Sequence, residues 1–120
     1  MKNVEANYWA IVPAAGIGKR FSADIPKQFH QLLGELVAQH TLKRLLDVRL
    51  IKRIIAPCDS ASGYWARVDA TRNPRVQLIE GGETRAHSVL SGLNALQNLA
   101  EPNDWVLVHD MARPCVTSSD

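Results

Sequence analysis

Short apolar runs and longer amphipathic stretches alternate along the chain. Four nearly continuous apolar runs predict strands buried on both faces: Tyr8–Pro13 (YWAIVP), Ile51–Pro57 (IKRIIAP), Val76–Glu80 (VQLIE) and Trp105–Val108 (WVLV). Helical spacing of apolar residues predicts a helix over Leu36–Asp47 and another over Arg85–Leu99. Gly34 marks a turn before the first helix, and Ser60–Pro74 is ambiguous, with a short helix and a polar turn as one reading. Strands and helices therefore follow one another in turn.

Each predicted helix has an apolar face. In the first helix this face consists of Val37, Leu42, Leu45 and Leu46. In the second it consists of Ala86, Val89, Leu90, Leu93 and Leu96. We expect these faces to cover a sheet, because an amphipathic helix buries its apolar stripe against a neighbouring layer.

The alternating order predicts an α/β fold with a mostly parallel, twisted, Rossmann-like sheet and helices on both faces. In such sheets ligands bind beyond the carboxyl ends of the strands, where the strand order reverses. Polar loops follow the first, third and fourth strands, at residues 13–27, 81–88 and 109–114. If the strand order is the common 3-2-1-4, the first and fourth of these loops face each other across a crevice.

Composition narrows the class of ligand. The 120 residues fit one domain, and a net charge of +2 is too small to indicate a nucleic-acid surface but suits an anionic small molecule. Cys58 and Cys115 are far apart and are expected to be reduced thiols. We find no signal peptide and no segment of membrane-spanning length, so we expect a soluble, cytoplasmic protein that binds neither membrane nor nucleic acid.

The first loop combines small residues with cations. Gly16 and Gly18 are too close for a Walker A loop, and Phe21 replaces the third glycine of the dinucleotide fingerprint. Small residues still allow close backbone approach to an anion, and cations lie beside them. The small residues are Ala14, Ala15, Gly16 and Gly18, and the cations are Lys19, Arg20 and Lys27. Taken alone, the loop is equally well described as a tight turn with solvated charges.

The other two loops carry complementary chemistry. Gly82, Arg85 and Ser88 resemble an anion-binding turn at a helix N-terminus. Asp110 follows a strand that ends at the crevice, where one carboxylate suits Mg²⁺ with phosphate oxygens, unless it serves as a cap. Arg113 is suited to clamp a second anion or is simply exposed. No Ser-His-Asp or Cys-His arrangement is evident, so the site suits transfer at phosphorus.

Four motifs resemble one enzyme family. These are Val12-Pro-Ala-Ala-Gly-x-Gly-x-Arg20, Pro26-Lys27-Gln28-Phe29, Gly81-Gly82-x-x-Arg85-x-x-Ser88-Val89 and Val108-His109-Asp110-x-Ala112-Arg113-Pro114. In this order they resemble the 2-C-methyl-D-erythritol 4-phosphate cytidylyltransferases of non-mevalonate isoprenoid biosynthesis. The resemblance covers nearly the whole chain. It implies transfer of CMP from CTP to the methylerythritol phosphate, with release of pyrophosphate and with Mg²⁺ as cofactor.

The resemblance also implies residue roles. Arg20 and Lys27 would stabilise charge on the α-phosphate, and Asp110 would hold Mg²⁺ near the phosphates. Arg113, with Asp110, would help to seat the methylerythritol phosphate. The remaining nucleotide-binding residues would contact the triphosphate or surround the cytidine: Ala14, Ala15, Gly16, Gly18, Lys19, Gly82, Arg85 and Ser88. Met111 stands where the family usually has Ala, which raises the question of whether Asp110 is displaced.

Family members continue well past this length, and the full-length enzyme is implied to be a homodimer. Residues 117–120 read as helix N-cap residues at the end of the chain. We therefore expect residues 1–120 to be the nucleotide-binding part of a single nucleotidyltransferase domain whose C-terminal half is missing. Such a piece is expected to have little or no activity and to associate through an open sheet edge. Two alternatives remain: a ribitol-phosphate cytidylyltransferase and a catalytically inactive CTP-binding remnant.

Overall fold

The computed structural model describes residues 6–14, 29, 31–32 and 34–111, and the structural statements below concern these residues. The strands are β1 (Tyr8–Ile11), β2 (Gln31–Leu32), β3 (Glu35–Leu36), β4 (Ile51–Cys58), β5 (Val76–Glu80) and β6 (Trp105–Val108). The helices are α1 (Val37–Leu46) and α2 (Arg85–Leu96), with 3₁₀ helices η2 (Gly63–Arg67) and η3 (Asp69–Arg72). All four predicted strands and both predicted helices are confirmed, with small differences at their ends.

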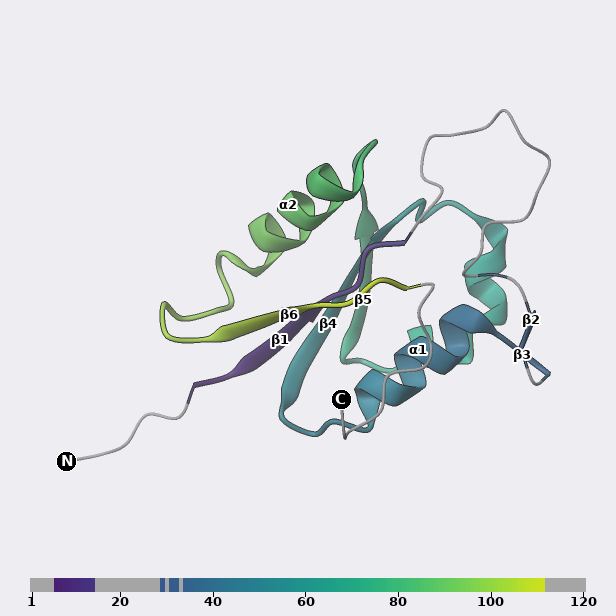
Figure 1. The fold of residues 1–120 in the computed structure, drawn as a ribbon, viewed down its shortest axis with the longest axis horizontal. Coiled ribbons are helices and arrows are strands. Elements are labelled where there is room, and N and C mark those ends of the chain that lie inside the picture. The colour runs from purple at the N-terminus through teal and green to yellow at the C-terminus, as the bar shows by residue number, and fades with distance from the viewer. Residues whose placement is uncertain (1–5, 15–28, 30, 33, 112–120) are drawn as a thin grey trace.

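The main sheet is parallel, with strand order β5-β4-β1-β6 (Figure 1). The chain passes outward from β1 to β4 and β5, and then returns to place β6 on the other side of β1. The α/β class is therefore confirmed, and the strand order is the common 3-2-1-4 on which the facing of the first and fourth loops depended. The order reverses between β1 and β6, where the carboxyl ends of a parallel sheet offer a place for ligands.

The small sheet of β2 and β3 was not predicted. Its two antiparallel strands have two residues each, with Gly34 between them. Strands of this length are too short to show an alternating pattern in the sequence. The ambiguous segment after β4 forms turns and two short 3₁₀ helices, where one short helix and a polar turn were considered.

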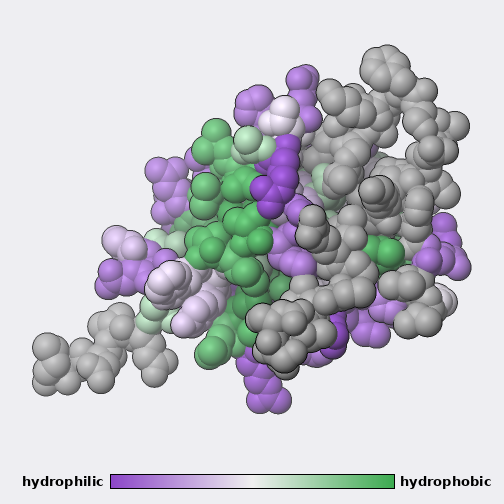
Figure 2. Space-filling model, in the orientation of Figure 1, coloured by the Kyte–Doolittle hydropathy of each residue, from purple (hydrophilic) through white to green (hydrophobic). Residues whose placement is uncertain are grey.

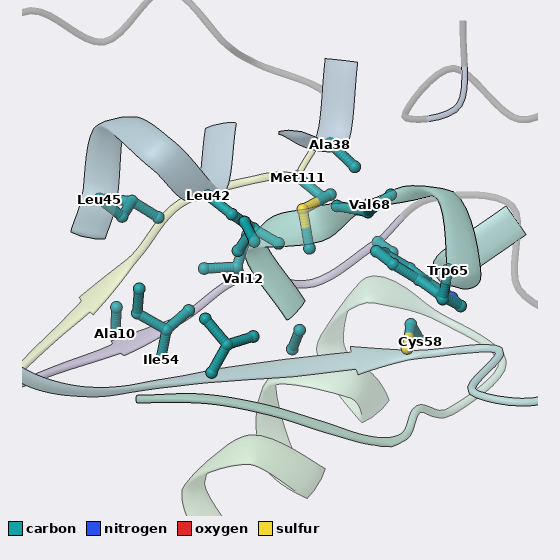
Figure 3. Close-up of a cluster of buried hydrophobic side chains, with 14 of the residues drawn as sticks. Ala10, Val12, Ala38, Leu42, Leu45, Ile54, Cys58, Trp65, Val68 and Met111 are labelled. Carbon is teal, nitrogen blue, oxygen red and sulfur yellow. The ribbon is translucent and has the colours of Figure 1, made fainter. Parts of the chain in front are cut away.

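One face of the sheet is covered by α1 and the 3₁₀ helices. Alternate residues of the central strands, such as Ala10 and Val12 of β1 and its extension, point to this side and join a large buried cluster. Figure 3 shows Leu42 and Leu45 of α1 above the strands, with Trp65 and Val68 closing one side. The core of the described molecule lies here.

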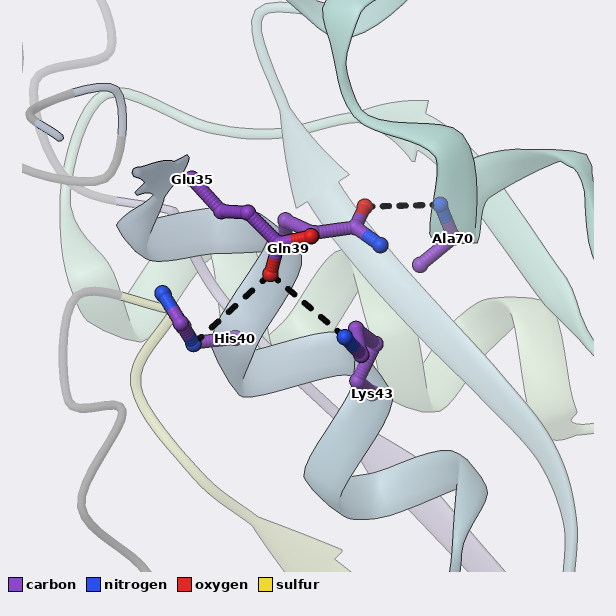
Figure 4. A network of polar contacts seen from close by, with 5 residues as sticks. All are labelled: Glu35, Gln39, His40, Lys43 and Ala70. Atoms are coloured by element: carbon purple, nitrogen blue, oxygen red, sulfur yellow. Dashed lines mark hydrogen bonds and ion pairs between the residues drawn. The ribbon is translucent and has the colours of Figure 1, made fainter. Parts of the chain in front are cut away.

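Polar contacts fasten α1 to its neighbours (Figure 4). The side-chain oxygen of Gln39 accepts a hydrogen bond of 2.9 Å from the backbone N–H of Ala70, which ties η3 to the helix. Glu35 lies 3.4 Å from the Lys43 ammonium and 4.0 Å from Nδ1 of His40. These contacts are largely exposed, so they orient the helix more than they stabilise it.

The other face is covered by α2, which buries Leu96 but not the rest of the apolar face predicted for it. The helix turns Ser88, Gly92 and Leu96 to the sheet, at spacings of four residues. A Cβ atom at Gly92 would lie 2.7 Å from Cγ2 of Ile11, so the small residues let the helix approach β1 closely. Leu90 and Leu93, which were expected in the core, are 54% and 43% exposed.

The prediction that β6 is buried on both faces is wrong. All four of its residues are exposed, and Trp105 is 64% accessible. Figure 2 shows apolar atoms gathered on the side that carries α2 and β6. The strand lies at the edge of the sheet beside β1, so its apolar side chains have partners from one direction only. Among the helices that the structure describes, none is long and apolar enough to cross a membrane.

Candidate functional site

The candidate site lies at the carboxyl edge of the main sheet. The parallel ladder continues past β1, since the N–H of Val12 donates to the carbonyl of Ile55 (2.8 Å) and that of Ala14 to Pro57 (3.0 Å). Ala14, the predicted start of the phosphate-binding loop, is buried against the large cluster. The first loop therefore leaves the sheet from a fixed backbone position.

The turn between β5 and α2 is organised by Ser88. The Ser88 hydroxyl accepts a hydrogen bond from the N–H of Gly82 (3.1 Å) and lies 3.4 Å from its carbonyl oxygen. The serine is 2% exposed. A Cβ atom at Gly82 would lie 2.3 Å from Cβ of His87, so only glycine fits between the turn and the helix. Ser88, predicted near the cytidine, thus shapes the predicted base-binding turn.

Thr84 completes the N-terminus of α2. Its hydroxyl accepts a hydrogen bond of 3.1 Å from the N–H of His87, as N-cap residues do. Thr84 was not predicted to cap this helix, although a threonine one residue before the predicted helix is a recognisable N-cap signal. The cap fixes where the helix starts and so where Arg85, its first residue, is placed.

Two predicted site residues from different loops meet directly. Nε of Arg85 donates to Oδ1 of Asp110 at 2.8 Å. The Arg85 side chain is 59% exposed and that of Asp110 is 32% exposed. β5 and β6 lie at opposite edges of the sheet, but α2 packs over β4, β5 and β1, and the side chain of its first residue reaches Asp110 beyond the end of β6. The contact joins the second and third predicted loops into one charged site.

The backbone around Asp110 is fixed on both sides. The N–H of His109 donates to the carbonyl of Ile11 (3.0 Å), and that of Met111 donates to Pro13 (2.9 Å). Met111 is fully buried in the large cluster (Figure 3). Successive side chains of extended backbone point to opposite faces, so Asp110 lies on the α2 side. The methionine side chain therefore packs away from the carboxylate and does not crowd it.

The donor set at Asp110 suits a hard cation. Within the described part of the chain, no three His, Cys, Asp or Glu side chains gather to form a metal site. A single, half-buried carboxylate fits Mg²⁺, which commonly takes one or two carboxylates and completes its shell with phosphate oxygens and water. A carboxylate has about four lone-pair sites, so contact with Arg85 is compatible with holding a cation.

The buried thiol of Cys58 is not suited to act as a nucleophile. Cys58 ends β4 beside this edge, and burial, together with the charges of Glu80 and Asp59, raises the pKa of its thiol to about 12. A thiol with such a pKa is protonated at neutral pH and unreactive. This agrees with the expectation of a reduced, structural cysteine, and Cys115 lies outside the described residues.

Several predicted site residues fall outside the part of the chain that the structure describes. They are Ala15, Gly16, Gly18, Lys19, Arg20, Lys27 and Arg113. The roles expected for them stay predictions. The structure brings together Arg85 and Asp110, and Gly82 and Ser88, at the carboxyl edge from which the first loop also departs.

Comparisons with known proteins agree on one family. The sequence model of the family 2-C-methyl-D-erythritol 4-phosphate cytidylyltransferase matches residues 8–120. Relatives with that name are 44% identical in Mannheimia succiniciproducens and 47% identical in Haemophilus influenzae, each over 111 residues. Each of these matches spans 92% of this chain and 47% of the relative. The chain thus spans about half the length of the curated relatives it matches.

Solved structures give the same result. The crystal structure of a 4-diphosphocytidyl-2C-methyl-D-erythritol synthase matches with a TM-score of 0.78 and 28% identity over 98% of this chain and 52% of that one. The cytidylyltransferase of Francisella tularensis matches with a TM-score of 0.76 and 36% identity over 95% of this chain and 48% of its own. The chain belongs to the 2-C-methyl-D-erythritol 4-phosphate cytidylyltransferase family.

Proposed function

We propose that this chain carries the nucleotide-binding half of an enzyme that transfers CMP from CTP to 2-C-methyl-D-erythritol 4-phosphate. A phosphate oxygen of the acceptor attacks the α-phosphorus of CTP, and the bond from that phosphorus to the bridging oxygen breaks as pyrophosphate leaves. The observation that carries the proposal is the Arg85–Asp110 contact of 2.8 Å at the carboxyl edge of the sheet, in a member of this family. The step belongs to isoprenoid biosynthesis.

The described residues divide the work between binding and positioning. The Gly81–Gly82 turn, held by Ser88 and placed at the capped start of α2, offers backbone groups to the cytidine. Arg85 orients the Asp110 carboxylate. Asp110 would hold Mg²⁺, which supplies charge neutralisation on the phosphates when bound. Positioning and charge neutralisation account for nearly all of the catalysis in transfer at phosphorus.

The remaining roles rest on the family motifs. Arg20 and Lys27 are proposed to stabilise the charge that gathers on the α-phosphate, and Lys19 adds a cation beside them. Ala14, Ala15, Gly16 and Gly18 are proposed to contact the triphosphate through the backbone. Arg113 is proposed to help seat the acceptor phosphate. We also propose a cytoplasmic location, a homodimer for the full-length enzyme, and no binding of nucleic acid or membrane.

The assay is pyrophosphate release in the presence of CTP, Mg²⁺ and methylerythritol phosphate. We expect little turnover from the 120-residue chain alone, and turnover from a chain extended to the length of its relatives. Arg20→Ala and Lys27→Ala in the extended chain should each reduce kcat by about 100-fold or more, as loss of one transition-state contact does. Full turnover by these variants would contradict the assigned roles.

Two alternatives are outcomes of the same assay. Preference for ribitol 5-phosphate over methylerythritol phosphate as acceptor would indicate a ribitol-phosphate cytidylyltransferase. Saturable CTP binding without turnover in the extended chain would indicate an inactive CTP-binding remnant. The relatives and structures that match this chain favour the methylerythritol enzyme.

A further inference from the structure

One buried polar side chain is not among the residues proposed to contact the nucleotide, and its hydrogen bond indicates another role for it in the site. Thr41 lies on α1 and is buried within the layer of the large apolar cluster. Its hydroxyl donates a hydrogen bond of 2.7 Å to the backbone carbonyl of Met111, 70 residues away in the sequence. A buried hydroxyl is costly unless it is paired, so this bond is a specific feature of the core.

The carbonyl that Thr41 contacts belongs to the residue directly after Asp110. Met111 is thereby held at three points: its carbonyl by Thr41, its N–H by Pro13 at 2.9 Å, and its side chain by the core. Asp110 is linked to Met111 by one planar peptide unit. The Met111 carbonyl belongs to the following peptide unit, but because the N–H and side chain of Met111 are also held, the Thr41 bond limits rotation about Met111 and so steadies the segment that carries Asp110.

Asp110 is thus held from two sides of the sheet. From the α1 side, Thr41 and Met111 fix the backbone, and from the α2 side, Arg85 contacts the carboxylate at 2.8 Å. Arg85 is 59% exposed and sits at a helix end, so its contact alone defines the carboxylate position poorly. The buried Thr41 bond supplies the rigid part of the arrangement.

We propose that Thr41 is a positioning residue for Asp110, acting through the backbone of Met111, and this rests on the proposed nucleotide site. Thr41 touches neither nucleotide nor metal in this arrangement. Groups that orient a metal ligand from outside its first contacts typically change metal affinity by about tenfold to 100-fold when they are lost. We place Thr41 at the lower end, because it acts through the backbone of Met111 and does not contact the Asp110 carboxylate.

The test compares three variants. Thr41→Val keeps the shape and removes the hydroxyl, while Thr41→Ser keeps the hydroxyl. Thr71→Val is the matched control, since the Thr71 hydroxyl also donates to a backbone carbonyl, that of Val68, at 2.8 Å, but on η3. The quantity measured is the ratio of CTP affinity with Mg²⁺ to CTP affinity in EDTA, at a temperature where all variants are folded.

Thr41→Val should lower this ratio by about tenfold, while Thr41→Ser and Thr71→Val should leave it within about twofold. An unchanged ratio in Thr41→Val, or an equal fall in Thr71→Val, would overturn the proposal. If Thr41→Val does not fold, Thr41→Cys, with a weak donor of similar size, replaces it and should show an intermediate loss. An unchanged ratio in Thr41→Cys then counts against the proposal.

A second measurement needs no nucleotide. The Nε–H group of Arg85 reports the position of the Asp110 carboxylate, because the two are hydrogen-bonded. Its proton resonance should shift towards the free-arginine value in Thr41→Val and stay unchanged in Thr41→Ser and Thr71→Val. If the unaltered chain binds no CTP, the proposed function fails, but this resonance still decides the role of Thr41: an unshifted signal in Thr41→Val overturns it.

Discussion

The two faces of the sheet are covered to different degrees. On the α1 side, the helix, the 3₁₀ helices and the strand residues form a continuous buried cluster that includes Leu42 and Met111. On the α2 side, the buried hydrophobic cluster of the described residues consists of Trp9, Ile11, Ile55 and Leu96. Leu90, Leu93 and the whole of β6 are exposed beside them. The α1 side of the sheet is therefore a continuous buried core, whereas the α2 side is only partly covered.

The difference shows how stability and chemistry are divided. Met111 contributes its side chain to the continuous buried core, while Asp110, one residue earlier, faces the α2 side with Arg85. A rigid, well-packed layer therefore supports the polar groups from behind, as precise sites require. The exposed apolar residues around β6 lie at the open sheet edge through which we expected the chain to associate. That association stays a prediction.

The largest effect that tests this comparison is a pair of leucine substitutions. Leu42→Ala on the α1 side removes a fully buried side chain and should cost about 2–5 kcal/mol of unfolding free energy. Leu90→Ala, at a position that is 54% exposed on α2, should cost less than about 0.5 kcal/mol. Urea unfolding followed by circular dichroism measures both. Equal losses would show that the α2 side is as well packed as the other.

The second effect concerns how α1 is joined to β4. The Arg75 guanidinium donates to the carbonyls of Leu46, Val48 and Ile51 at 2.9, 2.8 and 2.6 Å. These carbonyls lie at the end of the helix and the start of the strand, where partners are otherwise scarce. Arg75→Met keeps most of the side-chain volume but removes the donors, so it should cost about 2 kcal/mol in the same assay.

The control for Arg75 is Arg53→Met. Arg53 makes a single bond of 3.3 Å to the side chain of Gln77, so its loss should cost no more than about 1 kcal/mol. If both arginine variants lose the same stability, the carbonyl contacts of Arg75 do not have the role we assign to them.

A smaller effect is expected on the α2 side, at Gly92. Alanine favours a helix by about 1 kcal/mol over glycine, but its Cβ would lie 2.7 Å from Cγ2 of the fully buried Ile11. Overpacking of this kind costs about 1–3 kcal/mol, so Gly92→Ala should be net destabilising by about 1 kcal/mol. The exposed Asn94→Ala, in the same helix, should be neutral or slightly stabilising. Stabilisation by Gly92→Ala would mean that α2 is free to move off the sheet.

The smallest effect is a pH dependence at the start of β6. The Asp104 carboxylate accepts hydrogen bonds from the N–H of Glu101 (2.8 Å), from Trp9 Nε1 (2.9 Å) and from the N–H of Asn7 (2.9 Å). The bond from Glu101, followed by that from Trp9, lowers the pKa of Asp104 below its usual value of 3.8. The stabilisation is therefore present above pH 3.8 and is lost as pH falls through the lower, folded-state pKa.

Asp104→Asn removes the titrating group. Melting temperatures measured between about pH 2 and pH 6 should fall less steeply towards acid in the variant than in the unaltered chain. Asp69→Asn, at an exposed pair with Arg72, is the control and should leave the slope nearly unchanged. Parallel curves for the unaltered chain and Asp104→Asn would exclude Asp104 as a source of acid sensitivity.

Much of the fold followed from pattern. The bounds of β5 and β6 match the apolar runs, and the parallel sheet follows from the alternation of strands and helices. The apolar pattern did not predict which side of α2 faces the sheet. Hydrophobicity favoured burial of Leu90 and Leu93, whereas the small residues Ser88 and Gly92 are buried instead. The orientation of α2 is set by how closely the helix approaches Ile11, and the spacing of apolar residues in the sequence carries no information about that distance.

The residues of the candidate site were predicted from motifs and loop positions, but the contacts between them were not. Placing Arg85 and Asp110 at the carboxyl edge required only the loop positions, whereas their ion pair depends on how α2 crosses the sheet. The concern about Met111 came from reading it beside Asp110 in sequence, although alternation in extended backbone places the two side chains on opposite faces. Thr41 lies far away in sequence and carries no local motif, so it was not considered.

The most direct test of the central claim is calorimetric titration of the chain with CTP in the presence of Mg²⁺. We expect saturable binding with a clear preference for CTP over ATP. Arg85→Gln and Asp110→Asn should each weaken the binding by about tenfold. Arg72→Gln, which breaks only the exposed pair with Asp69, should leave it unchanged. Equal binding of CTP and ATP, or equal losses in the Arg85 and Arg72 variants, would contradict a cytidine nucleotide site at the Arg85–Asp110 edge.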